Sequence, residues 1–290
     1  MQTPVRYQHI LIKITLIFVC FALISGTALY VYRQTSHINS VLAAAERDTE
    51  TLLKEIAAQA LLEAKKKEPV YVTLKNADPI RAIVEDYTEQ RSLWVLVNKT
   101  HSISTSYVPR QLVLPDVPER TDKSIEERSL RGDVVAPLES MFDAAANEGH
   151  SLMIGSAYRS ATLQKSYFDT YAANSGIAAA NQYSAFPGQS EHQTGLAVDI
   201  SSVSRSCYLD ACFTSTPDGQ WLAANGYKYG FTLRYPEDKT EITGYNFEPW
   251  HYRYVGIDLA TALHQSSFTL DEAWPSLQTA LTTLKENGAL

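Results

Sequence analysis

The most apolar stretch of the chain lies near its start. Residues 14–32 carry no charged side chain and are flanked by Lys13 and Arg33. A helix needs about 20 apolar residues to cross the hydrocarbon core of a bilayer. The basic residues Arg6 and Lys13 lie on the short leading side, which favours a cytoplasmic N-terminus. We therefore expect residues 1–13 in the cytoplasm, residues 14–32 as a single-pass anchor in the cell membrane, and the rest of the chain outside the cytoplasm.

Two alternatives to an uncleaved anchor remain open. A cleaved signal peptide is the first, because Gly26, Thr27 and Ala28 offer small residues for cleavage. The apolar run continues past them as far as residue 32, which favours the anchor. Cys20 suggests a lipoprotein, but Val19 stands where a small residue is needed. We interpret Cys20 as an ordinary residue of the membrane span.

Residues 33–68 are expected to form a helical stalk. The part from Ile38 to Lys67 has no Gly or Pro and is rich in Ala, Leu, Glu and Lys, which are strong helix formers. Its apolar residues fall near a heptad spacing, but alanines and Thr49 weaken that seam. A solvated spacer is the expected role, and weak self-association through the stalk is the alternative. Pro69 should end the helix, because proline disfavours helix in the residue before it.

Beyond the stalk, helical and strand-like patterns mix without a regular alternation, which predicts an α+β fold rather than a doubly wound sheet. Helical spacing is found at 134–147, at 160–174 and near the end of the chain. Strand-like runs occur at 71–74, 94–97, 152–156, 195–200 and 250–255. We expect a folded body over residues 69–274 and a helical tail with a frayed end over residues 275–290.

The charge and the cysteine content of the chain exclude several classes of protein. The 290 residues include 25 Lys plus Arg against 32 Asp plus Glu, a formal net charge of −7. An acidic chain is poorly suited to binding nucleic acid through its phosphates, so we expect no nucleic-acid partner. Three cysteines without paired C-x-x-C spacing exclude a zinc ribbon and a disulfide-rich scaffold.

Three residues of the body suggest a catalytic metal site. His192 and Asp199 lie seven residues apart, and an apolar strand-like run leads into Asp199. A loop histidine and a strand carboxylate can reach one cation, and His251 adds a third ligand from a separate strand. Two histidines, one carboxylate and an open fourth position are typical of a catalytic zinc site. On spacing alone, a hydrogen-bonded loop histidine and a capping aspartate remain the alternative.

Glu248 lies three residues before His251, and the intervening Pro249 stiffens the connection. This spacing puts a carboxylate beside the metal without requiring it to be a ligand. Such a group can take a proton from zinc-activated water and pass it to a leaving amine. The alternative is an ordinary surface glutamate before a strand.

Polar residues around the histidine loop are candidates for substrate contact. Arg159 follows an apolar strand and precedes a helix, and a guanidinium there suits a ligand carboxylate through two parallel hydrogen bonds. A structural salt bridge is the alternative. Gln164 lies on the following helix, and Ser190 and Gln193 flank His192. These three either donate hydrogen bonds to the substrate or only shape the loop and the surface.

Several motifs, taken in chain order, resemble the VanY family of zinc carboxypeptidases. They are YRS followed by Q (158–164), SEHQTGLAVDI (190–200), WLAANGYKYGF (221–231), RYP (234–236) and EPWHYRYVG (248–256). The family belongs to the LAS group of peptidoglycan peptidases, which includes D-alanyl-D-alanine carboxypeptidases and dipeptidases. The resemblance covers about residues 94–274. It implies a small antiparallel sheet flanked by helices.

The resemblance also implies zinc as cofactor and a role for each residue. The metal ligands would be His192, Asp199 and His251, the catalytic acid/base would be Glu248, and the arginine that binds the substrate carboxylate would be Arg159. No ligand position departs from the family pattern, so we expect an active enzyme.

The resemblance leads to a specific expectation of function. Gln164 and Ser190 match family positions near the substrate. We expect a membrane-anchored zinc carboxypeptidase that removes a C-terminal D-alanine from peptidoglycan stem peptides, with D,D or L,D specificity open. The alternatives are a D,D-dipeptidase, a peptidoglycan endopeptidase, or a non-catalytic module that binds the cell wall.

Cys207 and Cys212 enclose four residues in the long segment between Asp199 and His251. An exported protein meets an oxidising environment, where such a pair can close a small loop. We therefore predict a disulfide, with two free thiols as the alternative. A metal role is not expected, because the zinc already has its ligands.

Overall fold

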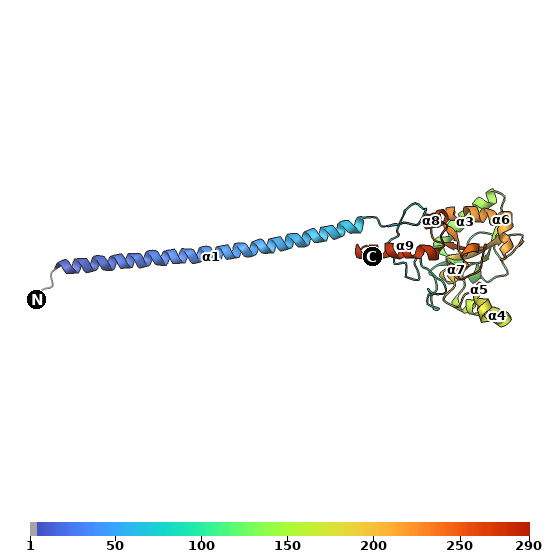
Figure 1. Ribbon diagram of the computed structural model, residues 1–290, viewed down its shortest axis with the longest axis horizontal. Helices are drawn as coiled ribbons and strands as arrows, with labels where there is room; N and C mark the ends of the chain where they lie inside the picture. The colour runs from blue at the N-terminus through green and yellow to red at the C-terminus, as the bar shows by residue number, and fades with distance from the viewer. Residues whose placement is uncertain (1–4) are drawn as a thin grey trace. The chain divides into compact units, whose positions relative to one another are not determined.

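The computed structural model describes residues 5–290 and divides the chain into two compact units, with the boundary between Lys65 and Lys66. In the first unit, helix α1 (Val5–Lys67) runs for 63 residues without a break (Figure 1). It is long and apolar enough to cross a membrane by length and composition, and its described side chains are almost all exposed. The expected anchor and stalk are therefore one helix, which ends where the stalk was predicted to end. The expected cytoplasmic segment falls partly on residues 1–4, outside the described residues.

The second unit is built around a four-stranded antiparallel sheet in the order β5-β6-β8-β7. These strands are β5 (Leu152–Ser156), β6 (Ala197–Ser202), β7 (Phe231–Leu233) and β8 (His251–Tyr254). The expected small antiparallel sheet is confirmed. Two short antiparallel pairs lie outside it: β1 (Tyr71–Val72) with β2 (Ile80–Arg81), and β3 (Leu112–Val113) with β4 (Leu130–Arg131).

Helices pack against this sheet, and most are labelled in Figure 1. The α-helices are α2 (Ile125–Arg128), α3 (Gly132–Asn147), α4 (Ala161–Ser175), α5 (Ile177–Tyr183), α6 (Pro217–Asn225), α7 (Thr240–Thr243), α8 (Ile257–Ser266) and α9 (Leu270–Glu286). Of these, α2, α3, α6 and α8 contact the strands of the sheet. The 3₁₀ turns are η1 (Glu191–Thr194), η2 (Ala211–Ser215), η3 (Gly226–Tyr229) and η4 (Glu237–Lys239). Ser160 caps α4, since its hydroxyl accepts a hydrogen bond from the Leu163 amide.

The two faces of the main sheet have different roles. Side chains alternate between faces along a strand, and Val198, Ile200 and Tyr252 pack with α3 and α6 in one hydrophobic core. Asp199 and His251 occupy the intervening positions and lie on the other face. This arrangement leaves one face of the sheet free to carry polar chemistry.

A second core joins both ends of the unit. Apolar residues of α8 and α9 pack against the segment from Val72 to Leu96. Leu277, Leu281 and Leu284 of α9 are buried in it, although they belong to the tail expected over residues 275–290. Helix α9 runs through Trp274 without a break, so the tail is an integral part of the body rather than a frayed end. Pro275 lies inside this helix, in its second turn, where it lacks the amide that would donate to the Asp271 carbonyl.

The strand expected at 94–97 is not formed. These residues are buried but make no ladder, and β1 contains only two of the four residues expected at 71–74. The carbonyl groups of Leu93 and Val95 accept hydrogen bonds from the Arg253 guanidinium instead of from a neighbouring strand. A side chain from far along the chain thus supplies the donors that a buried backbone needs.

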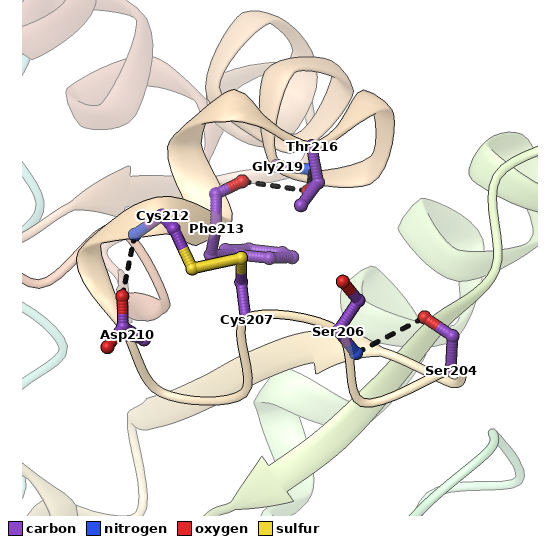
Figure 2. The surroundings of a disulfide bond; sticks show 8 residues. All are labelled: Ser204, Ser206, Cys207, Asp210, Cys212, Phe213, Thr216 and Gly219. Atoms are coloured by element: carbon purple, nitrogen blue, oxygen red, sulfur yellow. Dashed lines mark hydrogen bonds between the residues drawn. A yellow bond between two sulfur atoms is a disulfide. The ribbon is translucent and has the colours of Figure 1, made fainter.

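A disulfide joins Cys207 and Cys212, as predicted, in the loop between β6 and α6 (Figure 2). Within this loop the Cys212 amide donates to Asp210 Oδ1, at 2.9 Å. Just beyond it, the Thr216 hydroxyl accepts from the Gly219 amide, at 3.0 Å, and caps α6. The bond and the caps together fix how the chain leaves the sheet and enters α6.

Candidate metal and catalytic site

The site is assembled across the middle of the main sheet. Asp199 on β6 lies directly opposite His251 on β8 in the antiparallel register. Side chains of such a pair lie close together on the same face of a sheet. The Asp199 Oδ1 to His251 Nδ1 distance is accordingly 3.2 Å. The neighbouring strand β5 adds Ser156, which pairs with Asp199 on its other side.

His192 reaches the same carboxylate from the turn η1. Its Nε2 lies 3.4 Å from Asp199 Oδ1, while its Nδ1 is 2.5 Å from the Ala157 carbonyl oxygen. The turn ends at Gly195, whose φ of 70° lies in the left-handed region. A Cβ there would lie 3.2 Å from the Arg131 backbone. Glycine at this position therefore lets the chain leave the turn and enter β6 with His192 over the sheet.

These three residues fit a cation. One ligand atom from each of His192, Asp199 and His251 lies within 4.8 Å of the others, and all three side chains are buried. Asp199 Oδ1 and His192 Nε2 have no hydrogen-bond partner in the described chain. Unsatisfied buried acceptors are costly, and a bound cation would satisfy them. Within residues 5–290, no other cluster of His, Cys, Asp and Glu side chains has this geometry.

The protonation states of His192 and Asp199 also favour metal binding. Burial and the nearby Arg159 lower the pKa of His192 to about 4, so that its imidazole is neutral at pH 7. Burial opposes ionisation of Asp199, but His192 and His251 outweigh burial and hold the pKa of this carboxyl well below its usual range. A neutral imidazole and a charged carboxylate are the forms that bind a metal ion. At His251 burial lowers the pKa, but the carboxylates of Asp199 and Glu191 outweigh burial and raise the pKa to about 9, so a cation there would displace a proton.

Glu248 stands beside these ligands, as its spacing predicts. Its Oε2 lies 3.7 Å from His251 Nδ1, and the Tyr235 carbonyl accepts a hydrogen bond from its amide. Burial raises the pKa of Glu248 to about 7, with the charge of Asp199 adding to the effect. A carboxyl group with a pKa near 7 can both take up and release a proton under physiological conditions. This is a property of a general acid/base.

Arg159 and Gln164 lie at the same site. The Arg159 side chain is 17% exposed, its Nη2 lies 3.9 Å from Asp199 Oδ2, and its Nε has no partner in the described chain. Gln164 is buried and donates to the Ser184 hydroxyl and the Ala185 carbonyl, at 3.2 and 2.8 Å. Gln164 thus fixes the segment after α5. The Nε of Arg159 can therefore donate a hydrogen bond to a ligand.

A cavity of about 40 Å³ gathers most of the predicted residues. Its lining is Arg159, Gln164, Tyr183, Ser184, Ala185, Ser190, Glu191, His192, Tyr235, Tyr245, Glu248 and His251. Gln193 lies outside it, because its amide donates to the carbonyls of Ser104 and Tyr107 and thereby shapes the loop. Tyr252, next to His251 in β8, points into the core on the opposite face of the sheet.

Six lining residues were not predicted: Tyr183, Ser184, Ala185, Glu191, Tyr235 and Tyr245. Tyr235 packs its ring 4.8 Å from the His251 ring and also 4.8 Å from the Tyr245 ring. Glu191 is fully buried between two arginines. Tyr235 and Glu191 lie inside the quoted motifs and Tyr245 lies three residues before the last one, so proximity to these motifs was the available signal for these three. Their neighbours come from distant segments, which spacing alone does not reveal.

Comparison with known proteins agrees with the geometry. The family model described as VanY, D-alanyl-D-alanine carboxypeptidase, matches residues 127–257. The chain is 43% identical to a putative carboxypeptidase, YodJ, of Bacillus subtilis (strain 168), over 65% of this chain and 69% of that protein. It is 36% identical to a D-alanyl-D-alanine carboxypeptidase of Enterococcus faecalis, over 65% and 68% of the two chains.

Solved structures extend the similarity to three dimensions. An LD-carboxypeptidase, LdcB, is 41% identical with a TM-score of 0.61, covering 70% of this chain and 94% of that one. A mutant of the D,D-pentapeptidase VanY, solved with Zn(II), is 33% identical with a TM-score of 0.53, covering 64% and 99%. The zinc in that relative agrees with the His/Asp/His group found here. The chain therefore belongs to the VanY family of D-alanyl-D-alanine carboxypeptidases, and it is an enzyme of this zinc-dependent type.

Proposed function

We propose that this enzyme removes a single C-terminal D-alanine from peptidoglycan stem peptides on the outer side of the membrane. The observation that carries the proposal is one buried site that combines three metal-binding side chains, a carboxyl group with a pKa near 7 and an arginine whose Nε has no partner in the described chain. Each component has a distinct role in peptide hydrolysis. The relatives whose names refer to D-alanine support the choice of substrate.

His192, Asp199 and His251 would hold the zinc ion. When bound, zinc supplies Lewis acidity that polarises the scissile carbonyl and makes water a better nucleophile. Glu248 would take the proton from the attacking water, because its carboxylate lies on the side of His251 that faces the metal-binding atoms. Glu248 would then return this proton to the leaving amine. Its burial keeps the carboxyl group close to the pKa that such a two-way transfer needs.

Arg159 would bind the terminal carboxylate of the stem peptide. Its guanidinium lines the cavity, and two parallel hydrogen bonds to a carboxylate would fix the last residue of the peptide. A clamp on the terminal carboxylate restricts cleavage to the last peptide bond. Ser190, 5% exposed beside His192, and Gln164 would complete the walls around this residue.

The relatives include both D,D and L,D enzymes, so the stereochemistry at the cleaved bond is the main open alternative. The LdcB structure is described as an LD-carboxypeptidase and the VanY structure as a D,D-pentapeptidase. D,D cleavage removes the fifth residue of the stem, and L,D cleavage removes the fourth. Both present a terminal D-alanine carboxylate to Arg159.

A product analysis tests the proposal. Purified full-length protein in detergent is incubated with stem tetrapeptide, stem pentapeptide and free D-alanyl-D-alanine, and the products are identified by mass. Loss of one D-alanine from the pentapeptide indicates D,D activity, and loss from the tetrapeptide indicates L,D activity. Release of a dipeptide, or hydrolysis of the free dipeptide alone, would overturn the carboxypeptidase assignment.

A bifunctional D-Ala-D-Ala dipeptidase and carboxypeptidase of Enterococcus gallinarum is 32% identical over 90% of its length, which makes dipeptidase activity the second candidate. The helix α1 argues against a free cytoplasmic dipeptide as the main substrate. A non-catalytic wall-binding module is the third alternative. Loss of hydrolysis on chelation, with recovery on adding zinc, would exclude it.

We also propose that the protein is a single-pass membrane protein with its N-terminus in the cytoplasm. The apolar composition of residues 14–32 and the basic residues before them support this orientation. The segment up to residue 68 would then serve as a spacer between the bilayer and a body over residues 69–290. Weak self-association through this spacer remains a secondary proposal.

A further inference from the structure

Glu191 is a buried carboxylate that the proposed reaction does not use. It lies in η1, next to His192, and its side chain is fully buried. Its Oε1 accepts hydrogen bonds from Arg234 Nε and Arg253 Nη1, both at 2.8 Å. Both arginines are fully buried as well. Such a cluster is costly to desolvate and persists only when its geometry is well satisfied.

The second oxygen of Glu191 faces the metal ligand His251. Glu191 Oε2 lies 3.5 Å from His251 Nε2. Neither atom forms a hydrogen bond in the described chain, so this approach leaves two buried, unsatisfied atoms facing each other. The other ring nitrogen of His251, Nδ1, faces Asp199 and Glu248. The imidazole therefore lies between a carboxylate on one side and the proposed metal position on the other.

We propose that Glu191 is a positioning residue that orients His251 and keeps the proton of its imidazole on Nε2. A proton held there by a carboxylate leaves the Nδ1 lone pair available for the cation. Carboxylates that accept a hydrogen bond from a metal-binding histidine act in this way and increase the basicity of the ligand. This inference rests on the proposed metal site, because it assigns a function to Glu191 only through a ligand of that site.

The surroundings of Glu191 give it a fixed position. Arg234 is held from its other side by Asp271 in the first turn of α9, with Nη1 2.5 Å from Oδ2. Asp271 in turn accepts a hydrogen bond from Asn98, at 2.8 Å. The remaining N–H groups of Arg253 donate hydrogen bonds to backbone carbonyls, including that of Val95 at 2.9 Å. Segments from three distant parts of the chain therefore fix Oε1 of Glu191. The other oxygen, Oε2, then faces His251.

A purely structural role, in which Glu191 only neutralises the two arginines, makes a different prediction. In that case any loss of one negative charge from the cluster should have the same effect. Asp271 offers the matched comparison, because it pairs with Arg234 but does not contact His251. A positioning role requires that only the change at Glu191 alter the metal site.

The experiment compares Glu191→Gln and Asp271→Asn in the full-length protein in detergent. Zinc affinity is measured by competition with a chromophoric chelator, and the Co(II)-substituted proteins are compared by visible absorption. We expect Glu191→Gln to weaken zinc binding by about 10- to 100-fold and to change the Co(II) spectrum. Asp271→Asn should keep both within about threefold of wild type, while both variants lose thermal stability.

Three results would contradict this expectation in different ways. Equal zinc affinity in wild type and Glu191→Gln would overturn the positioning role. An equal loss in both variants would also overturn it, because the effect would then come from the charge cluster as a whole. A wild-type protein that does not bind zinc would instead overturn the proposed metal site itself, and this inference with it.

A measurement on the wild-type protein covers the case in which Glu191→Gln does not fold. Histidine labelled with ¹⁵N is introduced, and the imidazole of His251 is observed in the zinc-loaded protein. A far-downfield proton on Nε2 is expected, because a hydrogen bond to a carboxylate is charge-assisted. A proton on Nδ1, or an Nε2 proton without a downfield shift, would overturn the proposal.

Discussion

At the scale of single residues, Glu248 is the group on which hydrolysis depends most directly. Replacing Glu248 with Gln keeps the size of the side chain but removes its ability to accept a proton. We expect kcat for D-alanine release to fall by about 10²- to 10⁴-fold, the usual contribution of a general base. Zinc content, measured by atomic absorption, should be unchanged, because the three ligands remain.

Glu272→Gln is the matched control for this change. Glu272 is a partly buried carboxylate in the capping box of α9, outside the cavity. It should retain near wild-type turnover. A Glu248→Gln enzyme as active as Glu272→Gln would show that Glu248 is not the base.

The raised pKa of Glu248 predicts the pH dependence of the reaction. Burial lifts this pKa to about 7, so the carboxylate that must accept a proton is lost as pH falls through that value. The charge of bound zinc favours the carboxylate, which places the acidic limb of the profile at or below pH 7. We expect kcat/KM to fall as pH is lowered from about 8 to about 5. A profile that stays flat over this range would contradict the assignment of Glu248 as base.

Arg159 should determine recognition of the terminal carboxylate. Arg159→Lys keeps the positive charge but loses the planar pair of donors. We expect KM to rise by about tenfold or more, as the loss of a charge-assisted hydrogen bond of about 1.5–3 kcal/mol implies. A substrate whose C-terminal carboxylate is replaced by an amide serves as the control. Wild type should discriminate strongly between acid and amide, and Arg159→Lys only weakly; unchanged discrimination would refute the clamp.

The proposed metal ligands and Glu248 could be predicted from the sequence because their signals are local. Asp199 follows a continuous apolar run, His251 lies in a strand-like run of aromatic and polar residues, and Glu248 is three residues from His251. Glu191 was not predicted, because its environment depends on Arg234 and Arg253, whose burial is a property of the folded chain. In a linear sequence, a glutamate in this setting looks like any other loop residue.

At the scale of elements, the disulfide loop between β6 and α6 contributes to stability. Cys207 and Cys212 are separated by five positions. On the chain-entropy model, closing so small a loop is worth about 2 kcal/mol, which the double replacement by Ser should remove from the free energy of unfolding. Chemical denaturation under non-reducing conditions measures this difference.

The remaining cysteine provides the control. Cys20 is a free thiol on the exposed surface of α1, so Cys20→Ser should leave the unfolding of the body unchanged. Mass spectrometry without reductant should also show that Cys207 and Cys212 lack two protons. A double replacement that unfolds like wild type would mean that the loop is held by its caps alone.

Elements stabilised by local pattern were predicted more accurately than those stabilised by distant contacts. The strand 152–156 follows from its apolar run, and the helix after Ser160 follows from its helical spacing. The segment 94–97 has a strand-like composition but bonds to Arg253 rather than to a strand. The buried end of α9 was likewise missed, because its partners lie about 200 residues earlier in the chain.

At the scale of the whole molecule, the two units have different proposed functions. The first unit would hold the protein at the membrane, and the second would carry out catalysis. All the residues of the proposed site lie in the second unit, and none lies in the helix α1. The large hydrophobic fraction of the chain, 45%, therefore partly reflects a candidate membrane segment rather than the core of the enzyme. Activity and membrane location should be separable properties.

The topology can be tested with the full chain in bacterial cells. A tag is placed at each terminus, and spheroplasts are treated with a protease that cannot cross the membrane. If residues 14–32 form an uncleaved anchor with the N-terminus inside, the C-terminal tag should be digested and the N-terminal tag should stay protected in the membrane fraction. Cells broken before digestion are the control, in which both tags should be lost. A cleaved signal peptide would instead separate the N-terminal tag from a body recovered in the soluble exported fraction. The outcome bears on function directly, because a peptidoglycan peptidase held at the membrane meets the stem peptides nearest the bilayer, whereas a released enzyme would diffuse through the wall.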